Sequence, residues 1–217
     1  MNRLRAVFEK KGRAKYISHL DLNRCMLRTF RRSKLPIWYT EGFNPHPYFS
    51  FALALSLGFE SKCEILDFNI TEDIPCDVVR DRLNEVMPEG MKILSVAPQQ
   101  KKITLITSAE YEILLSSEDS KKLIEDVNSI MEEPEIPVEK KTKKGIKNVD
   151  IKPFIDIESV GEENGMVKII MRLPAGTQTN YNPNLFLDAL KKVRNSAFET
   201  EKICRNSILC ENNEIFF

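Results

Sequence analysis

The chain has 217 residues, an apolar fraction of 42% and a formal net charge of zero. That length holds one large domain or two of about 100 residues, and that apolar fraction excludes a disordered protein. No apolar run approaches the roughly 20 residues of a bilayer span and no apolar signal region follows the N-terminal residues, so we expect a cytoplasmic protein without a membrane partner.

Positive charge is concentrated at the N-terminal end of the chain. Residues 1–40 contain two acidic and eleven basic side chains, which give this segment a net charge of +9. The basic residues are Arg3, Arg5, Lys10, Lys11, Arg13, Lys15, Arg24, Arg28, Arg31, Arg32 and Lys34. A local field of this size attracts polyanions even when the whole molecule is neutral. The alternative is a solvated helix face that pairs with the acidic remainder of the chain.

The first hundred residues alternate between strand and helix patterns. Ser18 and Asp21 have the S-x-x-D spacing of a capping box, so a helix should begin near His19 and end before Pro36. The other expected elements are strands at 3–10, from 37, at 48–58, 64–70 and 91–97, and a helix at 77–86. This β-α-β-β-α-β order, with an extended or doubled middle strand, is the split βαβ pattern of ferredoxin-like domains.

A similar pattern follows the polar break at residues 98–102. The expected elements are strands at 109–115, 136–144, 149–160, 166–173 and 203–210, with helices at 117–131 and 182–193. We therefore predict an α+β protein of two ferredoxin-like (split βαβ) domains, residues 1–100 and 103–217. Each domain should have an antiparallel sheet with helices on one face.

A rigid loop follows the basic helix. It contains Gly42, Pro45 and Pro47, and loops of this composition usually present side chains to a ligand. Aromatic rings interleaved with positive charge suit stacked, single-stranded bases, although the same rings could fill the core. The expected nucleic-acid-binding residues are Arg13, Lys15, Arg24, Arg28, Arg31, Arg32, Phe43, His46 and Tyr48. A second basic cluster, at the tip of an expected hairpin, contains Lys140, Lys141, Lys143, Lys144 and Lys147.

A protein partner is a second expectation for the same region. The strand expected at 48–58 has large residues on one face and small ones on the other, and small side chains permit close approach. The alternative is that this face packs on the second domain. The expected partner-binding residues are Asn44, Pro45, His46, Pro47 and Ala52.

The sequence contains little that indicates an independent enzyme. It has no Walker loop, G-x-G-x-x-G motif or Ser-His-Asp order, so we expect no cofactor. Five cysteines without a C-x-x-C pair, and only two histidines, argue against a metal site. His19 beside Asp21 is the one catalytic candidate, as a general base for RNA cleavage by its own 2′-hydroxyl. A capping or packing histidine is the alternative.

Four motifs in the first seventy residues are specific enough to indicate a family. They are Tyr16-Ile17-Ser18-His19-Leu20-Asp21-Leu22 with Arg24, Arg31-Arg32 with Leu35-Pro36, Gly42-Phe43-Asn44-Pro45-His46-Pro47, and Ala54-Leu55 to Gly58. They resemble the radical SAM-linked domain family, a bacterial domain of unknown function that occurs alone or fused behind a cobalamin-binding radical SAM module. Residues 149–153 and 174–187 resemble its second half, with Lys152 where the family often has arginine.

The resemblance implies a radical SAM partner. The chain has no C-x-x-x-C-x-x-C motif, so it cannot itself hold the radical SAM cluster. We expect an accessory RNA-binding protein that acts with a radical SAM enzyme in RNA modification or processing. One alternative is a module that binds only the protein partner, and another is a metal-independent RNA endonuclease that uses His19. The oligomeric state stays open.

Overall fold

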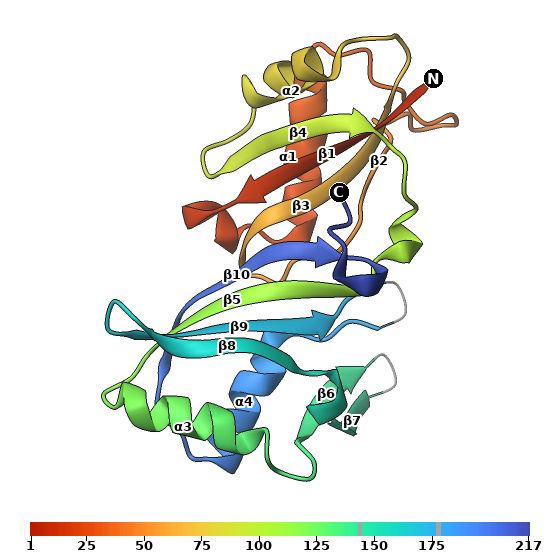
Figure 1. The fold of residues 1–217 in the computed structure, drawn as a ribbon. Helices are drawn as coiled ribbons and strands as arrows, with labels where there is room; N and C mark the ends of the chain where they lie inside the picture. The colour runs from red at the N-terminus through yellow and green to blue at the C-terminus, as the bar shows by residue number, and fades with distance from the viewer. Residues whose placement is uncertain (143–144, 177–178) are drawn as a thin grey trace. The chain divides into compact units, whose positions relative to one another are not determined.

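The computed structural model describes residues 1–142, 145–176 and 179–217, without the side chains of residues 140–142. It is a mixed α+β structure, shown in Figure 1. The chain divides into two compact units: unit 1 is Met1–Leu105 with Ile215–Phe217, and unit 2 is Ile106–Glu214. Among the described residues, no helix is long and apolar enough to cross a membrane.

Unit 1 contains a four-stranded antiparallel sheet and two α-helices. Its elements are β1 (Asn2–Lys10), η1 (Gly12–Tyr16), α1 (His19–Arg32), β2 (Phe49–Phe51), β3 (Glu60–Ile70), α2 (Cys76–Asn84), β4 (Met91–Pro98) and η2 (Ile103–Leu105). β1 lies between β4 and β3, and β2 pairs with the other edge of β3. The resulting order β4-β1-β3-β2 is that of a ferredoxin-like domain.

The core of unit 1 lies between this sheet and its helices. Phe8 and Phe68 come from the sheet, Met26 and Phe30 from α1 and Leu83 from α2, and all five are buried. α1 begins as the capping box predicts, because the hydroxyl of Ser18 accepts the backbone N–H of Asp21 at 3.1 Å. This cap fixes the start of the helix that carries the arginines.

Unit 2 repeats this arrangement of strands. Its described elements are β5 (Ser108–Ser116), α3 (Ser120–Ile130), β6 (Pro137–Thr142), β7 (Gly145–Asp150), η3 (Lys152–Phe154), β8 (Asp156–Glu163), β9 (Met166–Pro174), α4 (Pro183–Val193), β10 (Glu199–Leu209) and η4 (Glu211–Asn213). The antiparallel order β10-β5-β9-β8 matches that of unit 1, and β6 and β7 form a separate hairpin. The predicted fold class is therefore confirmed.

Three predicted strands are shortened or interrupted, and β3 and β10 each begin four residues earlier than predicted. The strand expected at 48–58 ends at Phe51, because the chain then bends away from β3 after the bond from the Ala52 N–H to the Ile65 carbonyl. Ile37 and Tyr39 form only isolated bridges. The strand expected at 149–160 is interrupted by η3, whose proline has no N–H to donate to a ladder.

Two of the eleven N-terminal cations are buried rather than part of a surface field. Arg5 is 2% exposed and makes a two-point ion pair with Asp67, with nitrogen–oxygen distances of 2.6 and 2.8 Å. Lys10 is 1% exposed and donates to the Ile17 carbonyl at 3.0 Å, and burial lowers its pKa. The exposed positive charge of residues 1–40 is therefore smaller than the sequence predicts.

Candidate nucleic-acid interface

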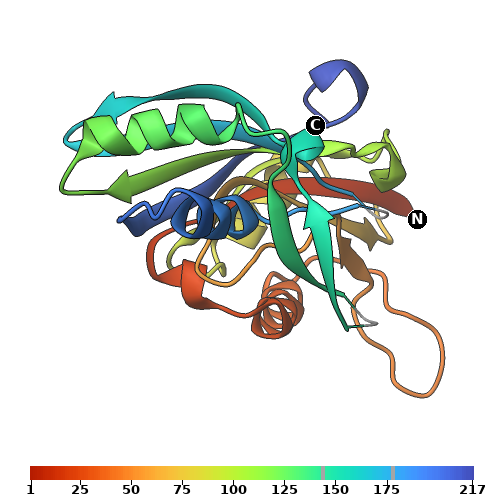
Figure 2. The same cartoon turned by 90° about the horizontal axis from the view of Figure 1, so that it is seen from below.

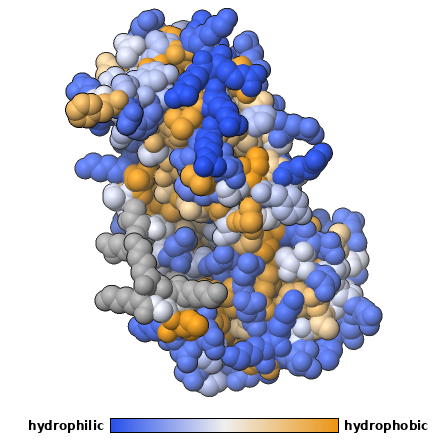
Figure 3. Space-filling model, turned by 180° about the vertical axis from the view of Figure 1, so that it is seen from behind, coloured by the Kyte–Doolittle hydropathy of each residue, from blue (hydrophilic) through white to orange (hydrophobic). Residues whose placement is uncertain are grey.

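The exposed face of α1 carries a row of arginines. Arg24, Arg28, Arg31 and Arg32 are all exposed, while Leu22, Met26, Thr29 and Phe30 are buried on the opposite face. Figure 3 shows a column of strongly hydrophilic side chains running down this part of the surface. Arg24, Arg28 and Arg32 follow one another in steps of four residues, which is about 6 Å along the helix axis for each step. Arg31 lies three residues after Arg28, so the four side chains form a continuous cationic strip.

One acidic side chain lies at the start of this row. Asp21 accepts from the Ser18 hydroxyl at 2.8 Å and pairs with Arg24 at 3.0 Å. The hydrogen bond from Ser18, and then Arg24, lower the pKa of Asp21. Both partners of the Asp21–Arg24 pair are more than half exposed, so this contact competes only weakly with a phosphate for the guanidinium.

The 3-10 turn η1 adds less charge than predicted. Arg13 is exposed and free to face a ligand, as expected. Lys15 is only half-exposed, and its ammonium lies 5.2 Å from the centre of the Tyr16 ring. Its backbone carbonyl accepts from the N–H of Gly58, which ties η1 to the segment before β3.

The loop from Trp38 to Tyr48, called here the aromatic loop, is a short hairpin. Tyr39 and Pro47 form an isolated bridge, and the N–H of Tyr48 donates to the Trp38 carbonyl at 3.0 Å. The rings of Trp38 and Tyr48 meet edge to face with centroids 5.4 Å apart. In Figure 2 this loop and α1 lie on the same side of the unit 1 sheet. The loop is therefore preformed on the same side of the sheet as the arginine row.

The side chains of the aromatic loop differ in their availability. Phe43 is fully exposed at the tip, Tyr48 is partly exposed, and Asn44, Pro45 and His46 are exposed. Pro47 is buried and does not present its ring to solvent; its backbone bridges Tyr39 at the base of the hairpin. Ala52 is half-buried just beyond the end of β2, so the small-residue face of a long strand does not exist as predicted.

The two histidines have different surroundings. The ring of His19 packs edge to face on Phe51 at 5.4 Å, and Asp21 is engaged with Ser18 and Arg24 instead. The expected His19–Asp21 partnership is therefore absent from the described interactions. His46 is held by the loop, since its Nδ1 lies 3.0 Å from the Asn44 carbonyl oxygen and 3.1 Å from the Thr40 hydroxyl.

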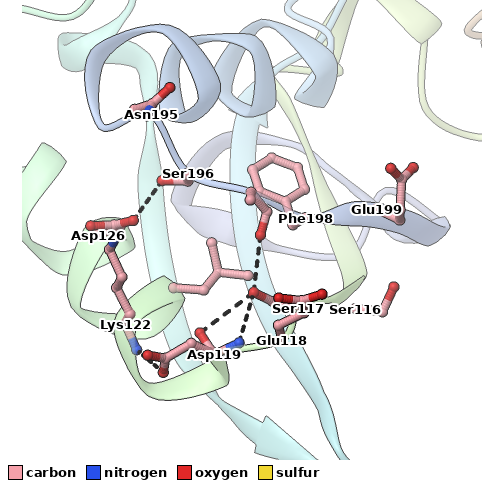
Figure 4. Close-up of a pocket in the computed structure, with 12 residues that line it drawn as sticks. Ser116, Ser117, Glu118, Asp119, Lys122, Asp126, Asn195, Ser196, Phe198 and Glu199 are labelled. Atoms are coloured by element: carbon pink, nitrogen blue, oxygen red, sulfur yellow. Dashed lines mark hydrogen bonds between the residues drawn. The ribbon is translucent and has the colours of Figure 1, made fainter.

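A pocket of about 570 Å³ lies in unit 2, at the ends of β5 and β10 beside α3 (Figure 4). Ser196 donates to Asp126 at 2.7 Å, and Ser117 donates to the Ala197 carbonyl at 2.9 Å. Asp119 caps α3 through the N–H of Lys122. These groups satisfy one another and fasten the α4–β10 connection to α3, and the pocket contains none of the predicted site residues.

Candidate metal ligands do not cluster in the part of the chain that the structure describes. No group of three or more histidine, cysteine, aspartate or glutamate side chains there is arranged to hold an ion. In the second basic cluster, Lys143 and Lys144 lie outside the described residues, as do the side chains of Lys140 and Lys141.

Three exposed apolar residues near the start of α1 were missed by sequence reasoning. Tyr16, Leu20 and Leu57 are 68%, 60% and 63% exposed. The bond from Gly58 to the Lys15 carbonyl brings the segment that contains Leu57 close to η1. The exposure of Leu20 was predictable, because Leu20 is out of phase with the buried stripe of α1. The exposure of Leu57 was not, because Leu57 continued the large-residue face of the predicted strand.

Comparisons with known proteins give a family but no function. No curated protein matches the chain. A solved structure titled "Crystal Structure of a Cbf5-Nop10-Gar1 Complex" contains a chain that is similar with a TM-score of 0.48 and 10% identity. The match covers 94% of this chain and 48% of that one, so this chain spans about half the length of that structure's chain.

A family model described as an uncharacterized protein conserved in bacteria (DUF2344) matches residues 3–183. The match includes all of the elements that build the candidate interface, from η1 and α1 to the aromatic loop. This protein therefore belongs to the DUF2344 family of bacterial proteins.

Proposed function

We propose that this protein binds RNA through the arginine row of α1 and the aromatic loop, and presents it to a radical SAM enzyme. The observation that carries the RNA part is the position of four exposed arginines and a preformed loop of exposed aromatic rings on one side of one sheet. Arginine binds phosphate in a two-pronged geometry, and exposed rings stack on unpaired bases.

The arginine row has no evident structural role. The opposite face of α1 packs into the core of unit 1, and none of the four arginines belongs to that core. Exposed guanidinium groups in a row repel one another mildly, so a row of four has a small energetic cost unless an anion neutralises it. An extended polyanion matches a linear strip better than an isolated anion does.

The radical SAM part of the proposal rests on the sequence resemblance. Fused family members would hold the two activities together at an effective concentration on the order of millimolar. A separate chain replaces that tether with an interface, and stable interfaces bury about 1,200–2,000 Å² in total. The role proposed for this chain is to bind and position the RNA, while the partner supplies the chemistry.

Two experiments in the native cells test the two parts separately. Ultraviolet crosslinking and sequencing should recover a defined set of RNAs with the wild-type protein, and far fewer with Arg24→Ala/Arg28→Ala. Affinity purification at physiological salt should recover a radical SAM protein with both. Recovery of no RNA above background would reject the first part, and absence of any radical SAM protein would reject the second.

A second candidate is a protein-binding module without nucleic acid. The exposed apolar residues Tyr16, Leu20 and Leu57 favour it, because exposed apolar side chains that gather in one region mark protein interfaces. Leu20→Ser should then abolish recovery of the partner, and this candidate, unlike the first, predicts that RNA crosslinking is at background in the wild type.

A further inference from the structure

We infer that the aromatic loop takes an unpaired nucleotide, with Phe43 stacking on the base and His46 bonding to its edge. The inference rests on the proposed RNA binding and names the substrate class: RNA with at least one unpaired base, rather than a continuous duplex. Three features of the loop carry it, namely its stiffness, the exposure of Phe43 and the orientation of His46.

The loop is held by hydrogen bonds between its own residues. The N–H of Thr40 donates to the His46 carbonyl at 2.9 Å, and the N–H of His46 donates to the Thr40 hydroxyl at 3.2 Å. Its base continues into the unit 1 sheet, since the N–H of Trp38 donates to the Asn69 carbonyl at 2.9 Å. A loop ordered before binding loses little chain entropy when a ligand arrives.

Phe43 lies at the turn of this hairpin with nothing covering it. Its relative exposure is 105%, and it follows Gly42, whose φ of +117° belongs to the region that favours glycine. The ring therefore contributes nothing to the core, while both of its faces are open. A phenyl ring displayed on a stiff turn is a surface on which a flat base can stack.

The loop fixes the orientation of His46. Its Nδ1 lies 3.0 Å from the carbonyl oxygen of Asn44, which can only accept, so Nδ1 carries the proton in this bond. In the neutral ring the proton is then absent from Nε2, which becomes an acceptor on an exposed side chain. Such an acceptor suits a donor on the edge of a base, such as the exocyclic amino group of adenine, cytosine or guanine or the N3–H of uracil.

Charge favours a base over a phosphate or an apolar protein surface at this loop. The tip contains Glu41, whose negative charge repels phosphate. The residues on either side of Phe43 are Gly42 and Asn44, which are small or polar. The cations lie on α1, on the same side of the sheet. In the proposed complex the phosphates of a strand lie on α1, and an unpaired base of that strand occupies the loop on the same side of the sheet. In a continuous duplex the bases are stacked and paired, and Phe43 could not reach a base face.

The test measures affinity for three RNAs of equal length: an unpaired strand, a blunt duplex, and the unpaired strand with abasic positions. Phe43→Ala should weaken binding of the unpaired strand roughly tenfold and leave the duplex unchanged. The abasic strand should bind equally weakly to wild type and Phe43→Ala. Phe43→Trp should restore the affinity for the unpaired strand. The unpaired strand should quench the tryptophan fluorescence of this variant more than it quenches that of the wild type, whose single tryptophan is Trp38. His46→Ala should weaken binding of the unpaired strand and leave binding of the duplex unchanged.

The outcomes separate this inference from the proposed function. If Arg24→Ala/Arg28→Ala weakens binding and Phe43→Ala does not, RNA binding stands and the stacking role is wrong. If wild type binds none of the three RNAs, the proposed function itself fails. If Phe43→Ala loses a radical SAM protein in pull-downs but keeps its RNA affinity, the loop is a protein-docking element and the inference is overturned. Equal melting temperatures of the variants would confirm that each is folded.

Discussion

The first helices of the two units hold the same place in the same topology and expose different residues. α1 exposes Arg24, Arg28, Arg31 and Arg32, whereas the exposed side chains of α3 are mixed: Lys121, Lys122, Glu125 and Asn128. Both helices bury an apolar stripe against a four-stranded sheet. The shared fold fixes the buried stripe and leaves the exposed face open to variation, so the arginine row is not a requirement of the fold.

The connections that follow these two helices also differ in the side chains that they expose. In unit 2 the connection contains the β6–β7 hairpin, and its Ile136, Val138 and Ile151 are buried. In unit 1 the corresponding connection contains the aromatic loop, whose tip is Phe43 and is fully exposed. Both connections bury apolar residues, which in unit 1 are Leu35 and Ile37, but the unit 1 connection also displays a fully exposed aromatic ring at its tip.

The largest expected effect contrasts an ion pair in each unit. Asp67→Ala should lower the free energy of unfolding by about 3–5 kcal/mol, because Arg5 is 2% exposed and would keep its charge without a carboxylate. Glu158→Ala in unit 2 removes a partner of Arg172 at 3.0 Å from a more exposed network and should cost about 1 kcal/mol or less. Urea denaturation measures both. Equal losses would mean that the Arg5 pair is not a buried structural pair.

The next effect contrasts a glycine in each unit. Gly90 has a φ of +82°, and a Cβ there would lie 2.6 Å from the Lys11 carbonyl oxygen and 2.9 Å from the Ala14 Cβ. Gly90→Ala should therefore cost about 2 kcal/mol or more. Gly161 in β8 has no atom within 4 Å of a Cβ and no positive φ, so Gly161→Ala should be neutral or slightly stabilising. Thermal melting of both variants checks this, and a neutral Gly90→Ala would contradict the described turn.

The smallest stability effect concerns the cap of α1. Ser18→Ala should cost roughly 1 kcal/mol, because the N–H of Asp21 loses its acceptor. The same change should raise the pKa of Asp21, which the Ser18 hydrogen bond lowers. Since the folded value lies below the ordinary one of about 3.9, the contribution of Asp21 is present above that pH and is lost as pH falls through the lowered value. NMR titration that finds the same pKa in both proteins would reject the assigned bond.

Local signals predicted the elements that local chemistry controls. The S-x-x-D spacing located the start of α1, and alternation located β5 and β9 within a residue of their observed ends. Alternation failed for residues 48–58, because Leu53 and Leu55 are buried without a strand partner. Side-chain parity shows which residues face a core, but pairing depends on the path of a distant strand.

The candidate site was predictable only where it is exposed. The spacing of the α1 arginines gave the row directly, since helical periodicity is local. The burial of Arg5 depended on Asp67, 62 residues away, and on Phe216, whose ring lies 4.6 Å from the guanidinium. Sequence alone counted Arg5 as surface charge because nothing near it in the chain indicates those partners.

The most direct measurement of the central claim is the salt dependence of affinity for a single-stranded RNA in three proteins. They are the wild type, Arg24→Ala/Arg28→Ala on α1, and the matched Lys121→Ala/Lys122→Ala on α3. Each phosphate contact contributes about 0.7 to the slope of log affinity against log salt, so the α1 variant should lose about 1.4 and the α3 variant should match the wild type. Equal slopes in all three proteins, or an equal loss in both variants, would contradict the assignment of RNA binding to α1.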